Sequence, residues 1–184
     1  METCCSPQDR DLGLAAALHS GALRYSLEYK DRATAEVMYK LALRVLSRLE
    51  SGPSRDEAVI RLKGDLAEFC AGDPGRLNEA EQLTLETLGL ISTCLGRGHF
   101  LSAVSLNNLA DIYTQQGRYA EAEPLYQRAV KMLDLDPCEQ PRILIAVLGQ
   151  YATMLRKLGR AAEAEELSAH AGEVSGRMRW AMQR

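Results

Sequence analysis

The segment Leu106–Asp134, LNNLADIYTQQGRYAEAEPLYQRAVKMLD, predicts two amphipathic helices joined by a tight turn at Gly117. Apolar residues recur at three- and four-residue steps on both sides of this glycine, so each side forms one apolar helix face. The two faces consist of Leu106, Leu109, Ala110, Tyr113, Tyr119, Ala122, Tyr126, Ala129 and Leu133. The small alanines leave room for large neighbours, as close packing of two antiparallel helices requires.

The same helix-turn-helix pattern recurs along the chain with a period of 42 residues. Glycine and alanine mark equivalent places in three copies, at Gly75, Gly117 and Gly159 and at Ala80, Ala122 and Ala164. The period predicts four helix pairs, over about residues 12–50, 55–95, 101–136 and 141–171. We therefore expect an all-α fold, a right-handed α-solenoid over residues 7–171.

The two ends of the chain have weaker patterns. Residues 1–6 lack apolar periodicity and are expected to form a disordered tail. Residues 172–184 are expected to extend the last helix or to cap the solenoid, with Trp180 covering its open end. Ser6 and Ser54 are suitable caps for the first and third predicted helices.

Two features of the repeat resemble a known family. The order Leu-Ala, Tyr, Gly-x-Tyr, then Ala, Tyr and Ala within Leu106–Asp134 resembles the tetratricopeptide repeat, which has about 34 residues. The junction CLGRGHF at Cys94–Phe100, followed by SLNNLA, is similar to that of kinesin light chain relatives, whose repeats have 42 residues. In that family the junction reads Leu-Gly, any residue, an acidic residue, His and Pro, so Gly98 and Phe100 depart from it. The resemblance implies a protein-binding module in which His99 fixes a helix start.

Composition excludes several classes of function. The 184 residues are 46% hydrophobic and 26% charged, which is ordinary for a soluble protein. A net charge of −3 argues against nucleic-acid binding, because affinity for phosphate backbones comes from concentrated Lys and Arg. No apolar run approaches the roughly 20 residues of a transmembrane helix. We therefore expect neither a nucleic-acid partner nor a transmembrane segment.

The five cysteines are an odd number and show no CxxC spacing, so they predict reduced thiols in the cytoplasm or the nucleus, and we expect a cytoplasmic protein. Cys70 and Cys94 are expected to be small core residues on helix faces. Cys4 and Cys5 are interpreted as idle thiols of the tail. The alternative is acylation at both, which would anchor the protein to a lipid membrane.

Residues that carry chemistry are few and scattered. His19, His99 and His170 match no metal-ligand spacing, and no nucleophile elbow or Walker-type loop is present. The carboxylates of the second helices are interpreted as solvated surface groups, among them Glu121, Glu123, Glu163, Glu165 and Glu166. We therefore expect no enzymatic activity, no cofactor and no metal.

The first helix of each pair is expected to line the concave side of the solenoid. Asn107, Asn108, Asp111 and Gln115 follow three- and four-residue steps on the face away from the predicted core. Equivalent positions in other repeats complete the candidate peptide groove: Arg24, Gln150, Thr153 and Lys157. Asn and Gln side chains suit an extended peptide, because they donate to carbonyls and accept from amides. The alternative is that Asn107 and Asn108 only cap or bridge neighbouring helices.

Two functions remain open at this point. The first is a scaffold or adaptor that binds a peptide or a helix of another protein in the groove. The second is a structural subunit or assembly factor that acts by self-association or within a larger complex, with a possible tether at Cys4 and Cys5. The sequence leaves the oligomeric state and the partner open.

Overall fold

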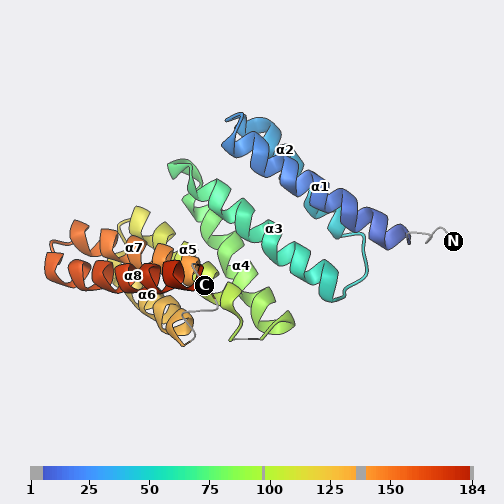
Figure 1. Cartoon of the computed structure of the whole chain (residues 1–184). Coiled ribbons are helices and arrows are strands. Elements are labelled where there is room, and N and C mark those ends of the chain that lie inside the picture. The colour runs from blue at the N-terminus through green and yellow to red at the C-terminus, as the bar shows by residue number, and fades with distance from the viewer. Residues whose placement is uncertain (1–5, 97, 136–139, 183–184) are drawn as a thin grey trace. The chain divides into compact units, whose positions relative to one another are not determined.

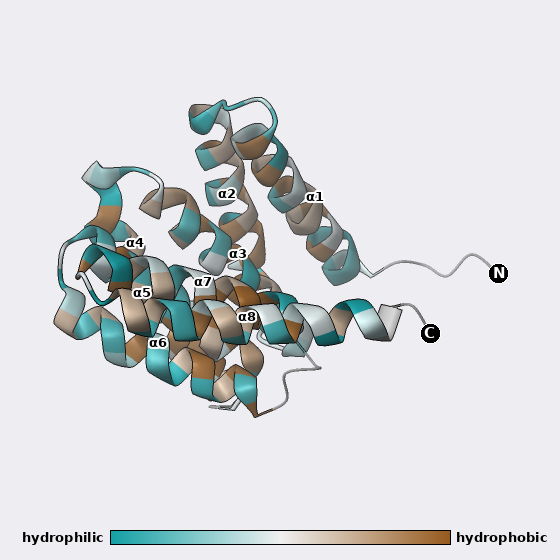
Figure 2. Ribbon diagram, turned by 60° about the vertical axis from the view of Figure 1, so that its left-hand side comes forward, coloured by the Kyte–Doolittle hydropathy of each residue, from teal (hydrophilic) through white to brown (hydrophobic). Residues whose placement is uncertain are grey.

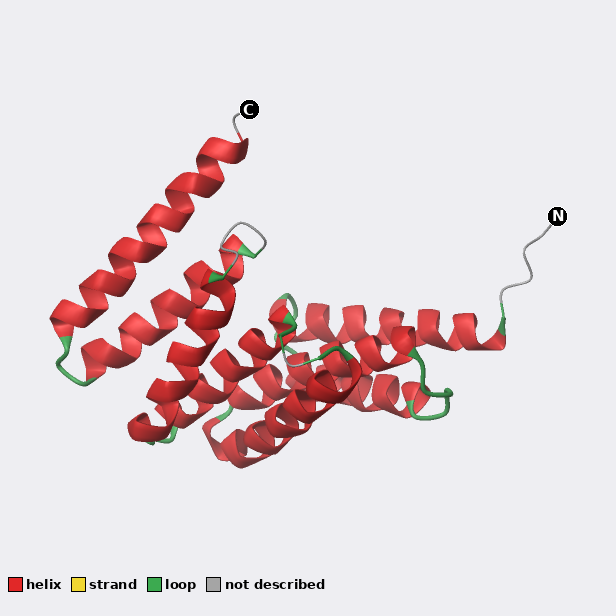
Figure 3. Ribbon diagram, turned by 90° about the horizontal axis from the view of Figure 1, so that it is seen from below, coloured by secondary structure: helices red, strands yellow, loops and turns green. Residues whose placement is uncertain are grey.

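The computed structural model describes residues 6–96, 98–135 and 140–182, which form helices and the turns between them, with no strand in these ranges (Figures 1 and 3). The elements are α1 (Pro7–Leu27), α2 (Arg32–Leu46), α3 (Pro53–Ala71), the 3-10 turn η1 (Pro74–Arg76), α4 (Leu77–Cys94), α5 (Phe100–Gln115), α6 (Tyr119–Asp134), α7 (Pro141–Lys157) and α8 (Ala161–Met182). The prediction of an all-α fold is confirmed. The predictions for Met1–Cys5, including Cys4 and Cys5, lie outside the described residues.

The chain divides into two compact units, here called the N-terminal unit (Met1–Cys94) and the C-terminal unit (Leu95–Arg184). Each unit contains two helix pairs. In the N-terminal unit, α1 pairs with α2 and α3 with α4, and α3 also packs on α2 and α1. In the C-terminal unit, α5 pairs with α6 and α7 with α8, and α7 packs on α6 and α5. Figure 2 shows that the helices carry both hydrophilic and hydrophobic residues, as amphipathic packing requires.

The second helices fill the core with the same residue types at equivalent positions. All of them are at most 5% exposed: Ala35, Tyr39, Ala42 and Leu46 of α2, and Ala122, Tyr126, Ala129 and Leu133 of α6. In α4, Thr84 and Thr87 replace the Tyr and the second Ala, and both are buried. Their hydroxyls donate to the carbonyls of Ala80 and Leu83 at 2.8 and 2.7 Å, which satisfies them inside the helix.

Three of the turns between paired helices contain a residue with a left-handed backbone. Gly117 and Gly159 have φ values of 75° and 74°, and Lys30, at 53°, takes this place between α1 and α2. The prediction that Gly75 forms an equivalent turn is wrong, because Pro74–Arg76 forms a 3-10 turn instead. The Asp73 carboxylate accepts a hydrogen bond from the Gly75 amide at 3.0 Å and holds this different turn in place.

The two turn types predict opposite responses to one substitution. Gly117→Ala is expected to lower the free energy of unfolding by about 1–2 kcal/mol, because alanine is strained at positive φ. Gly75→Ala is expected to leave it unchanged or raise it by up to about 1 kcal/mol, because a negative φ suits alanine. Chemical denaturation of both variants checks this. Equal losses at the two positions would contradict the assignment of two turn types.

Helix starts agree with the sequence at two of three predicted places. Ser6 caps α1 and forms a capping box with Asp9. His99 caps α5, because its Nδ1 accepts from the Leu101 amide at 3.3 Å. The prediction of Ser54 as a cap is wrong: the N-cap is Gly52 and α3 begins at Pro53, two residues earlier than predicted, because the fixed φ of proline suits the first helical position.

Of the two cysteines predicted as core residues, Cys70 is buried and Cys94 is exposed. Cys70 is fully buried, and burial raises the pKa of its thiol to about 11, so this thiol is inert near neutral pH. Cys94 is exposed at the last position of α4, so its prediction as a core residue is wrong. Trp180, near the end of α8, is 59% exposed.

Candidate functional site

The C-terminal unit presents most of the predicted groove residues on α5 and α7. Gln115, Gln150, Thr153 and Lys157 are exposed, while Asn108 and Asp111 are half-buried. Gln115 donates to the Asp111 carboxylate at 2.9 Å, and the Thr153 hydroxyl donates to the Gly149 carbonyl at 2.8 Å. These side chains therefore form polar stripes on two helices that pack against each other within one unit.

Asn107 does not share the exposure of this stripe. It is 7% exposed, and its Oδ1 atom accepts no hydrogen bond from the residues that the structure describes. The expectation that Asn107 faces away from the core is wrong, because α5 also buries the row that runs through Ala103, Asn107, Ala110 and Thr114. The solvent-facing stripe of α5 therefore begins at Asn108, one residue further along.

Arg24 lies in the N-terminal unit, whereas the other seven candidates belong to the C-terminal unit. Its side chain is exposed, its Nε donates to the Glu28 carboxylate at 3.3 Å, and its Nη2 lies 3.5 Å from the Tyr29 hydroxyl. This local pairing also raises the pKa of Arg24. Arg24 therefore makes its described contacts at the end of α1.

Sequence reasoning missed two open pockets in the N-terminal unit, where α1 meets α2 and α3. The first, here the acidic pocket, has a volume of about 190 Å³ and is lined by Asp65 and Glu68 together with Leu23, Leu27, Tyr39 and Phe69. The second, here the alanine pocket, has a volume of about 160 Å³ and is lined by Ala15, Ala16 and Ala58 with Leu12, Leu46 and Leu62. His19 lies at the alanine pocket and Asp65 at the acidic one, and His19 Nε2 is 2.6 Å from Asp65 Oδ2. This contact joins α1 to α3 between the pockets.

An arginine clamp that recurs after the turns was also missed. Arg76, Arg118 and Arg160 follow Gly75, Gly117 and Gly159, and each pairs with the glutamate three residues later, which is Glu79, Glu121 or Glu163. Arg76 and Arg160 also reach back to the preceding repeat. Arg76 contacts both Glu36 oxygens at 2.9 and 3.1 Å, and Arg160 contacts Glu123 at 2.8 Å. The signal in the sequence was the motif Gly-Arg-x-x-Glu, repeated every 42 residues.

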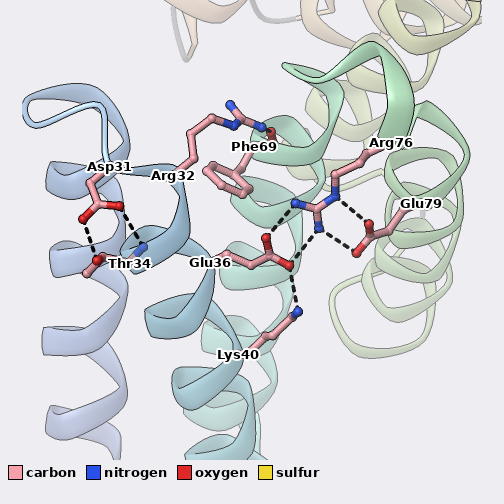
Figure 4. Close-up of polar contacts among 8 residues, drawn as sticks. All are labelled: Asp31, Arg32, Thr34, Glu36, Lys40, Phe69, Arg76 and Glu79. Atoms are coloured by element: carbon pink, nitrogen blue, oxygen red, sulfur yellow. Dashed lines mark hydrogen bonds and ion pairs between the residues drawn. The ribbon is translucent and has the colours of Figure 1, made fainter.

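The clamp of the N-terminal unit is the more enclosed of the two (Figure 4). Arg76 lies between Glu36 of α2 and Glu79 of α4, and Lys40 adds a contact of 2.7 Å to Glu36. The hydrogen bond from Lys40 and the charge of Arg76 lower the pKa of Glu36, and the hydrogen bonds from Arg76 lower the pKa of Glu79. These carboxylates therefore stay charged and hold two successive repeats together.

Glu123 corrects the interpretation of the second-helix carboxylates as solvated groups. It is half-buried, accepts from the Tyr151 hydroxyl at 3.1 Å and pairs with Arg160. The hydrogen bond from Arg160 lowers the pKa of its carboxyl group. Glu123 is equivalent to Glu36, so both units use this position to join their two helix pairs.

The described residues contain no cluster of three or more His, Cys, Asp or Glu side chains that suits a metal ion. Among the helices of the described ranges, none is long and apolar enough to cross a membrane. The three histidines instead serve as the cap of α5 and as partners of Asp65 and Asp134. The described histidines therefore serve helix capping and ion pairing, and the polar side chains of α5 and α7 form the candidate binding surface.

Comparison with known proteins agrees with this architecture. Residues 58–134, less than half of the chain, match the tetratricopeptide repeat family. No curated protein matches the chain. The match and the helix pairs support a tetratricopeptide repeat protein, a class whose domains generally bind other proteins and typically lack enzymatic activity.

Proposed function

We propose that the protein is a non-enzymatic adaptor of the cytoplasm that holds a peptide segment or a helix of a partner protein against the first helices of its repeats. One observation carries the proposal: the polar residues at equivalent positions of α5 and α7 face solvent, while their neighbours in the repeat are used in packing. Gln115 and Lys157 occupy the same repeat position, as do Asn108 and Gln150. Such a row of amide and charged groups suits the backbone and side chains of a bound peptide.

The period of 42 residues and the junction sequence Cys94–Phe100 also support a closer relation to repeats of the kinesin light chain type, as part of this proposal. The ligand is not transferred with it. Kinesin light chain relatives take acidic peptides in a basic groove, whereas the stripe here combines Asp111 with Lys157. The proposal therefore assigns the binding face to α5 and α7 and does not assign an acidic peptide as its ligand.

A triple variant tests this face. Gln115→Ala/Gln150→Ala/Lys157→Ala removes three exposed side chains from α5 and α7 and is expected to lose most partner protein in a pull-down. The matched control, Arg128→Ala/Lys131→Ala/Glu166→Ala, removes three exposed side chains from the second helices and is expected to retain the partner. Asn107 is left intact because it is buried. The same partners at the same yield in both variants would exclude this face.

A second function has its own support in the N-terminal unit. Leu14 of α1 and Leu41 of α2 are 50% and 43% exposed, which favours burial of this pair of helices against another subunit. In that case the protein acts as a structural subunit or assembly factor through self-association. Light scattering separates the two, because a strict monomer excludes the homo-oligomer. Fractionation of Cys4→Ser/Cys5→Ser tests the membrane-tethered form of the proposal.

A further inference from the structure

The acidic pocket and the alanine pocket differ in chemistry. The acidic pocket combines aliphatic walls, Leu23 and Leu27, with the aromatic rings of Tyr39 and Phe69, and carboxylates lie at its edge. The alanine pocket is lined by small and aliphatic side chains, with His19 and Arg61 as its polar members. The acidic pocket therefore combines apolar surface with carboxylates, whereas the wall of the alanine pocket is mostly apolar.

Arg32 also lines the acidic pocket, and its guanidinium is held by Phe69. Arg32 stacks on the Phe69 ring, 4.3 Å from its centroid, and donates to the Phe69 carbonyl at 2.8 Å, which holds its guanidinium against α3. Asp65 uses one oxygen for His19, and its other oxygen, Oδ1, accepts no hydrogen bond from the described residues. After burial, which acts most strongly, the charges of Asp65 and Glu68 raise the pKa of Tyr39 to about 12. Asp65 therefore lines the pocket with one carboxylate oxygen that a donor from a ligand can reach.

A long side chain with a terminal positive charge fits this combination. The methylene stem of Lys or Arg packs on aliphatic and aromatic walls, while its head donates to a carboxylate. A cation close to the ring faces of Tyr39 and Phe69 gains a further attraction. A carboxylate or a phosphate would instead meet like charge at Asp65 and Glu68.

The separation of the pockets sets the spacing of the ligand. The α1 residues that line them lie in residues 12–19 and 23–27, so their centres are about ten residues, or roughly 15 Å, apart along the helix. An extended chain advances about 3.3 Å per residue, so roughly four residues cover this distance. Side chains four residues apart in an extended chain also point to the same side.

We propose that the two pockets receive side chains from one extended partner segment: a lysine or arginine in the acidic pocket and an uncharged aliphatic residue, four positions away, in the alanine pocket. This proposal rests on the proposed function, since it names the kind of peptide that a first-helix face of the adaptor takes. The two-pocket proposal goes beyond the proposed function because it assigns a second binding face, on α1 and α3, to the N-terminal unit.

The test selects peptides from a random displayed library on the full-length protein. Wild type is expected to enrich Lys or Arg four residues from Leu, Ile, Val or Met, in either order. In the Asp65→Asn variant, the amide keeps the shape and an acceptor for His19, and the basic preference is expected to disappear while the aliphatic one remains. Ala16→Leu fills the alanine pocket from an exposed position. In this variant the aliphatic preference is expected to disappear while the basic one remains.

A selected peptide, labelled with a fluorophore, then gives the affinities by anisotropy. Asp65→Asn is expected to weaken binding about tenfold, as loss of one charge-assisted hydrogen bond predicts. The control Asp134→Asn also removes a carboxylate paired with a histidine, His170 at 3.2 Å, and is expected to leave affinity unchanged. Thermal unfolding of each variant shows that the fold is retained.

The outcomes separate this proposal from the function on which it rests. Selected peptides that lack the basic residue, or that bind Asp65→Asn as tightly as wild type, overturn the two-pocket proposal. If peptides that overturn the two-pocket proposal no longer bind Gln115→Ala/Gln150→Ala/Lys157→Ala, the adaptor function stands without the two-pocket proposal. A library from which no peptide is enriched overturns both.

Discussion

Replacing Tyr126 by alanine is expected to lower the free energy of unfolding by about 3–5 kcal/mol, the range for large aromatic residues lost from a core. The Tyr126 side chain is fully buried, and its ring stacks on Tyr151 with centroids 5.3 Å apart and planes at 11°. Tyr151 in turn contacts Glu123 and Gln127 of α6 through its hydroxyl group. The substitution therefore leaves a cavity in the contact that joins α6 to α7.

Tyr126→Phe separates the ring from the hydroxyl group. The hydroxyl oxygen is buried and makes no hydrogen bond with the described residues, so its removal is expected to be neutral or stabilising. Urea denaturation of both variants measures the difference, with Tyr29→Ala as the control. Tyr29 is 60% exposed and is expected to change stability by about 0.5 kcal/mol at most. A loss in Tyr126→Phe as large as in Tyr126→Ala would contradict this account.

The same hydroxyl predicts sensitivity to alkali. Burial raises the pKa of Tyr126 from 10 to about 12, so the folded state disfavours the phenolate. The stability that the neutral Tyr126 hydroxyl contributes is fully present below pH 10. The free energy of unfolding then falls by up to roughly 3 kcal/mol as the pH rises from 10 through 12. Tyr126→Phe is expected to reduce the loss of stability in alkali. Part of the loss is expected to remain, because burial also raises the pKa of Tyr39 to about 12 and that of Cys70 to about 11.

Periodicity predicted the paired helices because it records which side chains must be buried together. The alanines and tyrosines of α2 and α6 could be aligned from sequence, and they fill equivalent places in both units. The register also identified Gln115, Gln150 and Lys157 as side chains that face solvent. A repeated sequence pattern predicts burial well where each residue contacts only its own helix pair and the next helix pair in the chain.

The features that sequence reasoning missed depend on contacts between helix pairs. Asn107 looks polar and exposed when α5 is considered alone, and its burial requires knowledge of what surrounds that helix. The contact between His19 and Asp65 joins residues 46 positions apart, so no local pattern records it. Gly75 kept the spacing of the turn glycines, but Pro74 changed the backbone that this spacing was taken to predict.

Arg76→Ala is expected to lower the free energy of unfolding by about 2–3 kcal/mol, because the substitution removes several charge-assisted hydrogen bonds from a partly buried cluster. The Arg76 and Glu36 side chains are only 21% and 27% exposed, so water replaces the lost partner poorly. Arg76→Lys keeps the charge but cannot contact Glu36 and Glu79 through one planar group, so it is expected to recover only part of the loss. Arg61→Ala is the control, since the pair with Glu57 is exposed and contributes at most about 0.5 kcal/mol.

The pH dependence of the Arg76→Ala effect identifies its cause. The hydrogen bond from Lys40, together with the charge of Arg76, lowers the pKa of Glu36, and the hydrogen bonds from Arg76 lower the pKa of Glu79 below the ordinary value of 4.5. The stability that these carboxylates contribute is therefore present above that pH and is lost as the pH falls below it. The gap between wild type and Arg76→Ala is therefore expected to be largest near neutral pH and to narrow in acid. Denaturation at a series of pH values measures this gap. A gap independent of pH would mean that Arg76 acts through packing on Phe69, whose ring centroid lies 5.8 Å from its guanidinium carbon, and not through the two carboxylates.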